Sequence, residues 1–179
     1  SSTSRGLGDV YKRQEKRLLD LQKWFNPKHY KRLWNVGPPG ALLTGLIVYT
    51  TLKIDTFLGL PLINFSYFWQ KILMVLTGLE GMIILLWILF SLPPKERGIK
   101  LSKRGIYSFI RHPVYTVIIF HLPVFYALLF RSFGVLLVIP AIYIFWSKTI
   151  VREEEYLVGI FGEDYVDYMR EVPRFIPWR

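Results

Sequence analysis

The sequence predicts an all-α integral membrane protein with about four transmembrane helices, an N-terminal interfacial helix and a cytoplasmic C-terminal helical extension. Three observations predict this fold. The apolar residues stand in long blocks, although an apolar fraction of 52% would by itself also fit a soluble domain. The basic residues, which give a formal net charge of +10, cluster between these blocks. The length of 179 residues suits one domain.

The composition also narrows the classes of function. The chain contains no cysteine, which excludes a disulfide framework, a thiolate metal site and a cysteine nucleophile. A basic protein without apolar blocks would indicate nucleic-acid binding. With such blocks, basic clusters are typical of the cytoplasmic flanks of membrane helices. We therefore expect a membrane-embedded protein with no nucleic-acid partner and no metal site.

The first 36 residues are interpreted separately. Residues 1–14 lack the apolar core of a signal peptide. Their last six residues, DVYKRQ, look like a translated sequencing-library adapter, so we expect a disordered sequencing or cloning artefact with the natural start lost upstream. Residues 15–36 mix basic and aromatic side chains in a pattern that predicts an amphipathic interfacial helix, with a flexible basic lead-in as the alternative. Residues 37–179 then form a single membrane domain.

Four apolar stretches predict the membrane spans. The first is expected to end near Leu52, because the break at residues 59–61 (Gly-Leu-Pro) argues against one straight helix through the whole apolar stretch. The second ends at Pro93 and exceeds the roughly 20 apolar residues that cross a bilayer core. A tight turn at Arg131 joins the last two, and the final helix is expected to continue toward Phe161. The spans are expected at residues 39–52, 68–92, 113–130 and 133–150.

The distribution of lysine and arginine predicts the orientation. The segment before the first span and the loop at residues 93–111 are strongly basic. The loop at residues 53–66 has one lysine and one aspartate, and the turn at Arg131 has one arginine. We therefore expect both termini and the 93–111 loop to face the cytoplasm, which four spans allow.

Two polar segments, residues 93–111 and 148–179, are expected to meet at this surface because the last two spans join them as a hairpin. The first segment leads into Arg-His-Pro. Pro113 suits the first turn of a helix, and His112 would lie at its cap beside free backbone donors that can hold a carboxylate. The alternative is that Arg111 snorkels and His112 caps the span without a ligand.

The second segment carries three consecutive acids, beginning at Glu153. Neighbours on a helix point about 100° apart, so Glu153 and Glu154 cannot both face one pocket squarely. One could meet an ammonium group while the other pairs with a cation from the facing loop, and a solvated helix face is the alternative. Glu80 and His121 lie within spans, where ionisable groups are functional candidates, although each could equally be a buried structural group.

Together, the two segments resemble the isoprenylcysteine carboxyl methyltransferase family. Arg-His-Pro-x-Tyr is followed about forty residues later by Glu-Glu-x-x-Leu-x-x-x-Phe-Gly-x-x-Tyr-x-x-Tyr and a closing Pro-Arg-x-Ile-Pro. The match covers roughly residues 99–177, and the phospholipid N-methyltransferases share a looser version. The resemblance implies that residues 37–179 are a methyltransferase domain, with S-adenosylmethionine as cofactor and a lipid or lipidated small molecule as substrate.

The resemblance also implies roles for single residues. The first glutamate of the pair is a cofactor contact in the family, and a carboxylate can hold the methionine ammonium. The family uses an arginine one helical turn earlier for the substrate, where this chain has Thr149 with Lys148 nearby. The catalytic candidates are Arg111, Arg152 and Glu154. The candidate cofactor-binding residues are Lys100, Leu101, Ser102, Tyr107, His112, Pro113, Tyr115 and Glu153.

The implied reaction is in-line displacement of the methyl group from the sulfonium, in which the protein mainly orients and desolvates the reactants. A carboxylate acceptor is already ionised, whereas an amine must first lose a proton to a base. We expect methylation of a lipidic or prenylated carboxylate at the cytoplasmic membrane face. The alternatives are a phospholipid N-methyltransferase and a non-enzymatic membrane protein that retains the fold.

Overall fold

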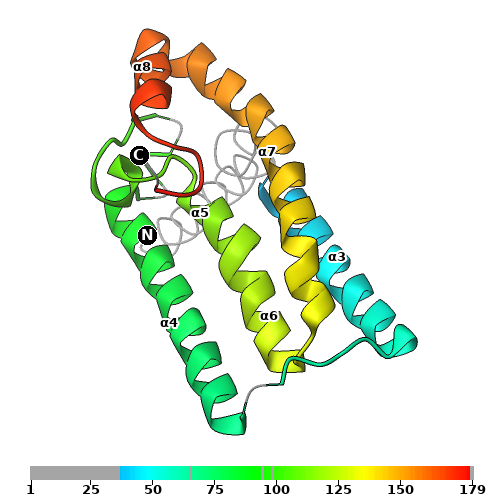
Figure 1. Cartoon of the computed structure of the whole chain (residues 1–179). Coiled ribbons are helices and arrows are strands. Elements are labelled where there is room, and N and C mark those ends of the chain that lie inside the picture. Colours follow the sequence, from blue (N-terminus) through cyan, green and yellow to red (C-terminus); the bar gives the residue numbers. More distant parts are fainter. Residues whose placement is uncertain (1–36, 65, 94, 98, 178–179) are drawn as a thin grey trace, which may run out of the picture. The chain divides into compact units, whose positions relative to one another are not determined.

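The computed structural model describes residues 37–177, except residues 65, 94 and 98. The predicted artefact at residues 1–14 and the predicted interfacial helix at residues 15–36 lie outside the described residues. The described part is helical, with a single isolated β-bridge between Leu62 and Ser132 (Figure 1). The prediction of an all-α protein is confirmed.

Four helical segments of the described part are long and apolar enough to cross a membrane, which confirms the predicted number of spans. The third is continuous but built from two α-helices and a π-helical turn, and the fourth continues to Phe161 as expected. The spans are α3 (Gly37–Leu58), α4 (Tyr67–Ser91), α5 (Pro113–Thr116) with η2 (Val117–His121) and α6 (Leu122–Phe130), and α7 (Phe133–Phe161). A 3-10 helix, η1 (Gly105–Ser108), precedes α5, and α8 (Glu163–Glu171) follows α7.

The first span is longer than predicted. Helix α3 continues past Leu52 to Leu58 and ends where Gly59 takes a positive φ of 60°, a conformation that glycine adopts without steric cost. The polar side chain of Asp55 does not interrupt this helix because it is buried against the start of α7. The Asp55 carboxylate accepts hydrogen bonds from the Ser132 hydroxyl and from the backbone N–H of Gly134 (3.2 Å). The break at residues 59–61 therefore ends the span, six residues later than expected.

The predicted tight turn between the third and fourth spans is confirmed. Arg131 adopts the left-handed conformation with a φ of 55°. The Ile63 N–H donates to the Arg131 carbonyl (2.8 Å), and the Arg131 Nε donates to the Ile63 carbonyl (2.9 Å). The loop after α3 is thereby tied to the hairpin.

Helices α3 and α7 lie side by side, as α4 and α6 do (Figure 1). The ring of Trp146 on α7 packs directly on Gly40, where an added Cβ would lie 2.4 Å from the ring. The Trp146 indole N–H donates to the Thr44 hydroxyl (2.9 Å). A small residue in α3 thus allows a large aromatic side chain of α7 to fill the core.

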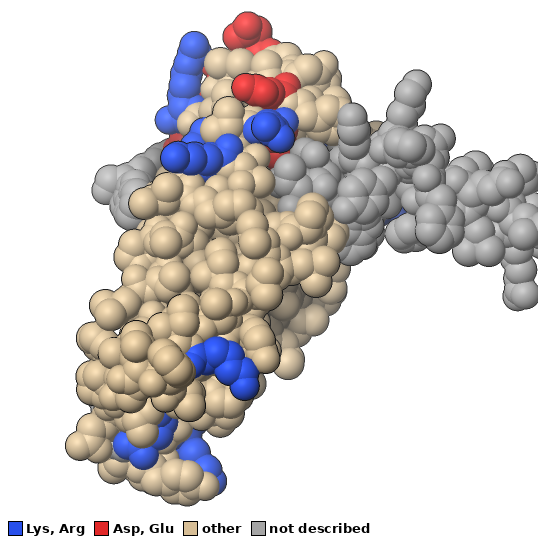
Figure 2. Space-filling view, turned by 90° about the vertical axis from the view of Figure 1, so that its right-hand side faces the viewer, with Lys and Arg blue, Asp and Glu red and all other residues tan. Residues whose placement is uncertain are grey.

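The surface of the described part suits a bilayer. Large apolar side chains are exposed along α4, for example Leu76, Ile83 and Phe90. Figure 2 shows charged side chains gathered at the end that carries α8, a few basic ones toward the opposite end, and a broad uncharged band between them. This is the pattern of a protein whose middle lies in hydrocarbon.

Candidate functional site

The hairpin brings the two polar segments into direct contact at one end of the bundle. The C-terminal segment runs alongside the residues that begin α5. The N–H of Arg111 donates to the Pro173 carbonyl (2.9 Å), and the N–H of His112 donates to the Arg174 carbonyl (3.0 Å). The hydroxyl of Thr116 then donates to the carbonyl of the next residue in the C-terminal segment, Phe175 (2.8 Å). The sequence stretch Arg-His-Pro is therefore held in place by backbone pairing.

Glu154 is the centre of a buried polar network. Its Oε1 lies 3.0 Å from Arg111 Nη2 and 3.3 Å from His112 Nε2. Its Oε2 accepts from Nε (2.9 Å) and Nη2 (2.5 Å) of Arg174. The side chains of Arg111 and Glu154 are only 7% and 5% exposed. A buried carboxylate is tolerated when it is paired and hydrogen-bonded, and here three residues compensate it.

Glu153 occupies the other side of the same histidine. Its Oε2 accepts a hydrogen bond from the Tyr115 hydroxyl (2.6 Å), and its Oε1 lies 3.8 Å from His112 Nδ1. The Tyr115 ring is itself fixed against Trp146, with the ring centroids 4.5 Å apart. The Glu153 side chain is 20% exposed and therefore remains reachable. Of the two glutamates, Glu154 is therefore the one paired with arginine, and Glu153 is the more accessible one.

The loop before α5 is anchored to the end of α4. The Ser102 hydroxyl donates to the Ser91 carbonyl (3.0 Å), and the Ser91 hydroxyl accepts from the N–H of Ile106 (3.3 Å). Gly105 has a φ of 59°, and a Cβ there would lie 2.2 Å from the Ser91 Oγ. Only glycine fits this approach, so the loop can lie close over the end of the membrane helix.

Tyr107 connects this loop to α8 and to the charged residues of the site. Its carbonyl accepts from the Tyr168 hydroxyl (2.6 Å). Burial raises the pKa of the Tyr107 hydroxyl above its usual value, the charge of Arg97 lowers it and the charge of Glu153 raises it further. Burial likewise raises the pKa of Tyr168.

The structure gathers some of the predicted site residues and leaves others apart. Lys100 points to the surface, where its ammonium lies 3.3 Å from a Glu96 carboxylate oxygen. Leu101 packs against the buried cluster around Tyr165, and Arg152 is exposed. Five of the predicted residues are connected by hydrogen bonds, ion pairs or ring contacts: Arg111, His112, Tyr115, Glu153 and Glu154.

One residue of this region was not predicted as a site residue. Arg174 stands inside the closing Pro-Arg-x-Ile-Pro motif, which was a signal for the residue but not for its contact with Glu154.

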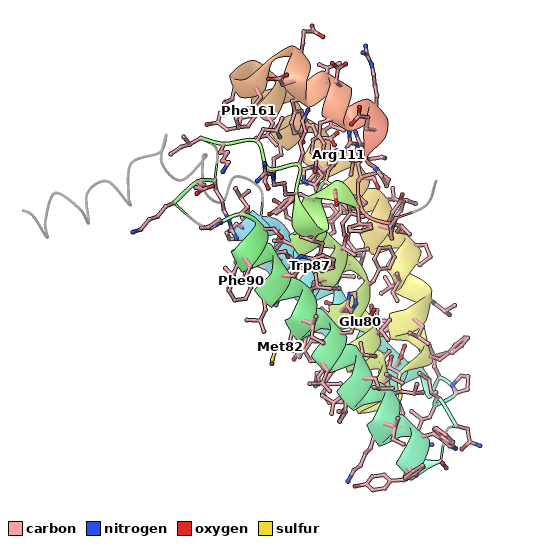
Figure 3. All side chains as sticks on the ribbon, turned by 90° about the vertical axis from the view of Figure 1, so that its left-hand side faces the viewer. Glu80, Met82, Trp87, Phe90, Arg111 and Phe161 are labelled. Carbon is pink, nitrogen blue, oxygen red and sulfur yellow. The ribbon has the colours of Figure 1, made fainter. Side chains whose placement is uncertain are left out.

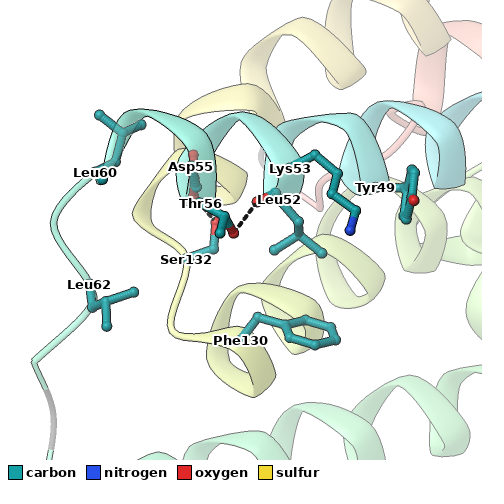
Figure 4. Close-up of a pocket in the computed structure, with 10 residues that line it drawn as sticks. Tyr49, Leu52, Lys53, Asp55, Thr56, Leu60, Leu62, Phe130 and Ser132 are labelled. Carbon is teal, nitrogen blue, oxygen red and sulfur yellow. Dashed lines mark hydrogen bonds between the residues drawn. The ribbon is translucent and has the colours of Figure 1, made fainter.

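Two other polar features lie away from this set. Glu80 and His121 face each other between α4 and η2, with Glu80 Oε2 3.6 Å from His121 Nε2, and Figure 3 shows Glu80 about midway along α4, far from Arg111. A pocket of about 540 Å³ lies at the opposite end of the bundle, beside Lys53 and Asp55 (Figure 4). It contains none of the predicted site residues.

Comparison with known proteins agrees with the motifs. Residues 87–159 match the model of the isoprenylcysteine carboxyl methyltransferase family. The chain is 37% identical over 73 residues to a protein-S-isoprenylcysteine O-methyltransferase of Schizosaccharomyces pombe. The aligned segment covers 41% of the chain and 31% of the relative. The chain is also 38% identical over 76 residues to methanethiol S-methyltransferase 1 of Bradyrhizobium diazoefficiens, and the aligned segment covers 41% of the chain and 25% of the relative.

A third relative, protein-S-isoprenylcysteine O-methyltransferase B of Arabidopsis thaliana, is 29% identical over 84 residues, covering 47% of the chain and 43% of the relative. The chain thus spans less than half the length of the curated relatives it matches. The matched residues include the Arg-His-Pro stretch and both glutamates of the site. On this match, residues 87–159 of the chain resemble the isoprenylcysteine carboxyl methyltransferase family.

Proposed function

We propose that this protein is an S-adenosylmethionine-dependent membrane methyltransferase that methylates a lipidic or prenylated carboxylate at the cytoplasmic membrane face. The observation that carries the proposal is the pair of glutamates around His112, one buried and fully paired, the other reachable and oriented by Tyr115. This arrangement lies in the segment that matches the family. It also lies at the end of a membrane helix, where a water-soluble cofactor and a lipid-borne acceptor can both arrive.

The residues present fit the cofactor. Glu153 offers a partly exposed carboxylate for the methionine ammonium, and the Tyr115 hydroxyl bonded to it fixes its direction. The buried tyrosines and His112 provide a rigid, partly apolar wall. The cofactor supplies the activated methyl group, so the chain has to orient the two reactants and exclude water.

The state of Glu154 favours a carboxylate acceptor over a phospholipid amine. An amine acceptor must give up a proton to a base within reach. Glu154 is paired with Arg111 and Arg174 and contacts His112, and a carboxylate paired with two arginines is a poor proton acceptor. A carboxylate acceptor needs no base, and two exposed cations stand on the same helix to attract it, Arg152 directly before Glu153 and Lys148 about one turn before Arg152.

A thiol acceptor is the second candidate. The relative from Bradyrhizobium diazoefficiens is named a methanethiol S-methyltransferase. At the position where the family uses an arginine for the substrate, the hydroxyl of Thr149 donates to the Phe145 carbonyl of its own helix (2.8 Å). A neutral side chain there suits an acceptor without a carboxylate, so this candidate is tested beside the first.

The test is binding of S-adenosylhomocysteine to the purified chain in lipid nanodiscs, measured by calorimetry. Glu153→Gln should weaken binding at least about tenfold, because it removes a charge-assisted contact worth roughly 1.5–3 kcal/mol. Glu155→Gln changes an exposed neighbour and is the matched control. If the folded chain does not bind S-adenosylhomocysteine, the proposed function is wrong.

The acceptor is then identified with cofactor carrying a labelled methyl group. A prenylcysteine analogue, a small thiol and phosphatidylethanolamine are offered in parallel to the same preparation. Label is expected in the prenylcysteine analogue as a base-labile ester. Label found only in the thiol would select the second candidate, and label in phosphatidylethanolamine would overturn both.

A further inference from the structure

The pocket at the end of the bundle opposite to the two glutamates is a second place where a ligand can bind. It lies between the C-terminal part of α3, the loop that follows it and the turn that joins α6 to α7 (Figure 4). Its volume of about 540 Å³ falls within the range of roughly 300–1,000 Å³ that is usual for ligand pockets. The methyl donor is expected at the other end of the bundle, so this pocket has a different occupant.

One wall of the pocket carries a buried acid that is only half bonded. The Asp55 side chain lines the pocket, and the residue is 9% exposed. Its Oδ2 accepts hydrogen bonds from the Ser132 hydroxyl and from the Gly134 N–H (3.2 Å). Within the described part of the chain its Oδ1 has no hydrogen-bond partner. Since a buried carboxylate requires donors or a cation to compensate it, the pocket favours a ligand with a positively charged donor.

The opposite charge in the pocket wall comes from Lys53. Its ammonium lies 5.5 Å from the centroid of the Tyr49 ring, and among the described residues it forms no ion pair. Side chains two residues apart on a helix do not face each other, so Lys53 and Asp55 do not neutralise one another. The Thr56 hydroxyl, which also lines the pocket, is already used, because it donates to the Leu52 carbonyl (2.9 Å). The pocket therefore offers one cation and one anion to a ligand.

The rest of the lining is apolar and lies at the level where α3 leaves the membrane. Leu62 and Phe130 line the pocket and are 64% and 53% exposed. Helix α3, a membrane span, ends at Leu58, next to the pocket. This is the depth of lipid headgroups, and Figure 2 shows a few basic side chains toward the same end. A ligand with a zwitterionic head and apolar tails matches these surroundings.

We propose that this pocket binds a phospholipid whose headgroup carries a primary amine, of the phosphatidylethanolamine type. The lipid ammonium donates to the Asp55 carboxylate, and the lipid phosphate pairs with Lys53. Such charge-assisted hydrogen bonds are stronger than neutral ones. A bound lipid would stabilise the bundle, because the loop that forms one wall is tied to the α6–α7 turn by the hydrogen bonds between Ile63 and Arg131. The inference does not depend on methyl transfer.

The experiment compares three lipids with identical acyl chains on the delipidated full chain in detergent, without cofactor, by native mass spectrometry. Phosphatidylethanolamine should bind at least about tenfold more tightly than phosphatidylcholine, whose quaternary ammonium has no N–H to donate, and than phosphatidylglycerol, which has no cation.

The variants test each charge separately. Lys53→Gln should weaken phosphatidylethanolamine and phosphatidylcholine alike, about tenfold, because both lipids carry the phosphate. Asp55→Asn should remove the preference for phosphatidylethanolamine over phosphatidylcholine. Lys71→Gln is the matched control, since the Lys71 ammonium lies over the Tyr67 ring (4.3 Å to the centroid) and does not line the pocket.

A further variant keeps the test independent of the structural role of Asp55, which also joins α3 to α7. Thr56→Trp fills the pocket from an exposed position and should lower phosphatidylethanolamine binding in a folded chain. Equal affinity for the three lipids would overturn the inference, as would a preference for phosphatidylethanolamine that survives both Lys53→Gln and Thr56→Trp. Tighter binding of phosphatidylglycerol would also overturn it, because Lys53 alone would then recognise the phosphate. Binding of S-adenosylhomocysteine by the same preparation would leave the proposed function standing in each case.

Discussion

At the scale of the residue, Glu154 and Glu153 show how sequence neighbours acquire different chemistry. They stand about 100° apart on α7. Glu154 turns toward the loop and the C-terminal segment and is enclosed by Arg111, His112 and Arg174, whereas Glu153 turns toward Tyr115 and stays partly exposed. Glu154 therefore stabilises the arrangement of the site, whereas Glu153 remains accessible to a ligand.

Removing the Glu154 carboxylate should therefore act mainly on stability. Glu154→Ala leaves the buried Arg111 and His112 and the partly exposed Arg174 without their carboxylate, and breaking a buried ion pair costs roughly 3–5 kcal/mol. We expect a clear drop in the thermal unfolding temperature of the chain in detergent. Glu155→Ala, which alters an exposed side chain of the same run, should change it little. An unaltered unfolding temperature in Glu154→Ala would contradict the network described above.

The residues of the site were only partly predictable. Arg111, His112 and Glu153 were found because their order and spacing form a motif. Arg174, which pairs with Glu154, was not predicted. Its contact with Glu154 depends on how the chain reverses direction after Gly162, where φ is 60°.

At the scale of the element, close approach between helices depends on small residues whose role is invisible in a hydropathy pattern. Gly40 and Gly45 both lie in α3. Gly40 lies under the ring of Trp146, while a Cβ on Gly45 would meet no atom within 4 Å. The sequence presents both as glycines of one apolar helix, and only the structure shows that the first is required.

Substitution of these two glycines should give opposite results. Gly40→Ala places a methyl group 2.4 Å from the Trp146 ring and should destabilise the chain by about 1–3 kcal/mol through overpacking. Gly45→Ala should be neutral or slightly stabilising, since alanine in a helix is favoured over glycine by roughly 0.5–1 kcal/mol. Unfolding in graded denaturing detergent measures both. Equal stability of the two variants would show that α3 and α7 do not pack as described.

The boundaries of the elements were harder to predict than their existence. Four spans were expected and four are present in the described part of the chain, because an apolar stretch of about 20 residues is long enough to cross a bilayer core. The end of α3 was misplaced because Lys53 and Asp55 read as polar breaks, although Asp55 is buried against α7. The π-helical turn Val117–His121 carries no sequence signal, and it packs His121 against Gly81 of α4.

At the scale of the whole molecule, the chain offers a direct test of its orientation, because it contains no cysteine. A single cysteine introduced as Lys103→Cys lies in the loop beside the site, and Leu60→Cys lies in the loop at the other end. In sealed inverted vesicles, whose cytoplasmic face is outward, an impermeant maleimide should label Lys103→Cys and spare Leu60→Cys. Leu137→Cys, an exposed position of α7 within the apolar band, should remain unlabelled. The reverse pattern would place the site on the other face of the membrane.

The length of α7 has a consequence for the membrane in which the protein works. Its 29 residues span about 43 Å at about 1.5 Å per residue, whereas a bilayer core is about 30 Å thick. Counted from the turn at Ser132, a hydrocarbon core of this thickness would end near Arg152, so we expect Glu153 at the depth where acyl chains give way to headgroups. The same helix that carries the glutamate also sets how deep it lies.

Bilayer thickness should accordingly regulate turnover. In vesicles of thicker acyl chains the site would sink below the headgroups and lose access to a soluble cofactor, unless the helix tilts less or the bilayer thins locally. In vesicles of shorter acyl chains the site would lie above the membrane surface, out of reach of an acceptor that is held in the lipid. Methyl transfer measured across phosphatidylcholines of increasing chain length should pass through a maximum, and the methyl donor's KM should rise on the thick side. A rate of methyl transfer that does not change with acyl-chain length would contradict this placement of Glu153.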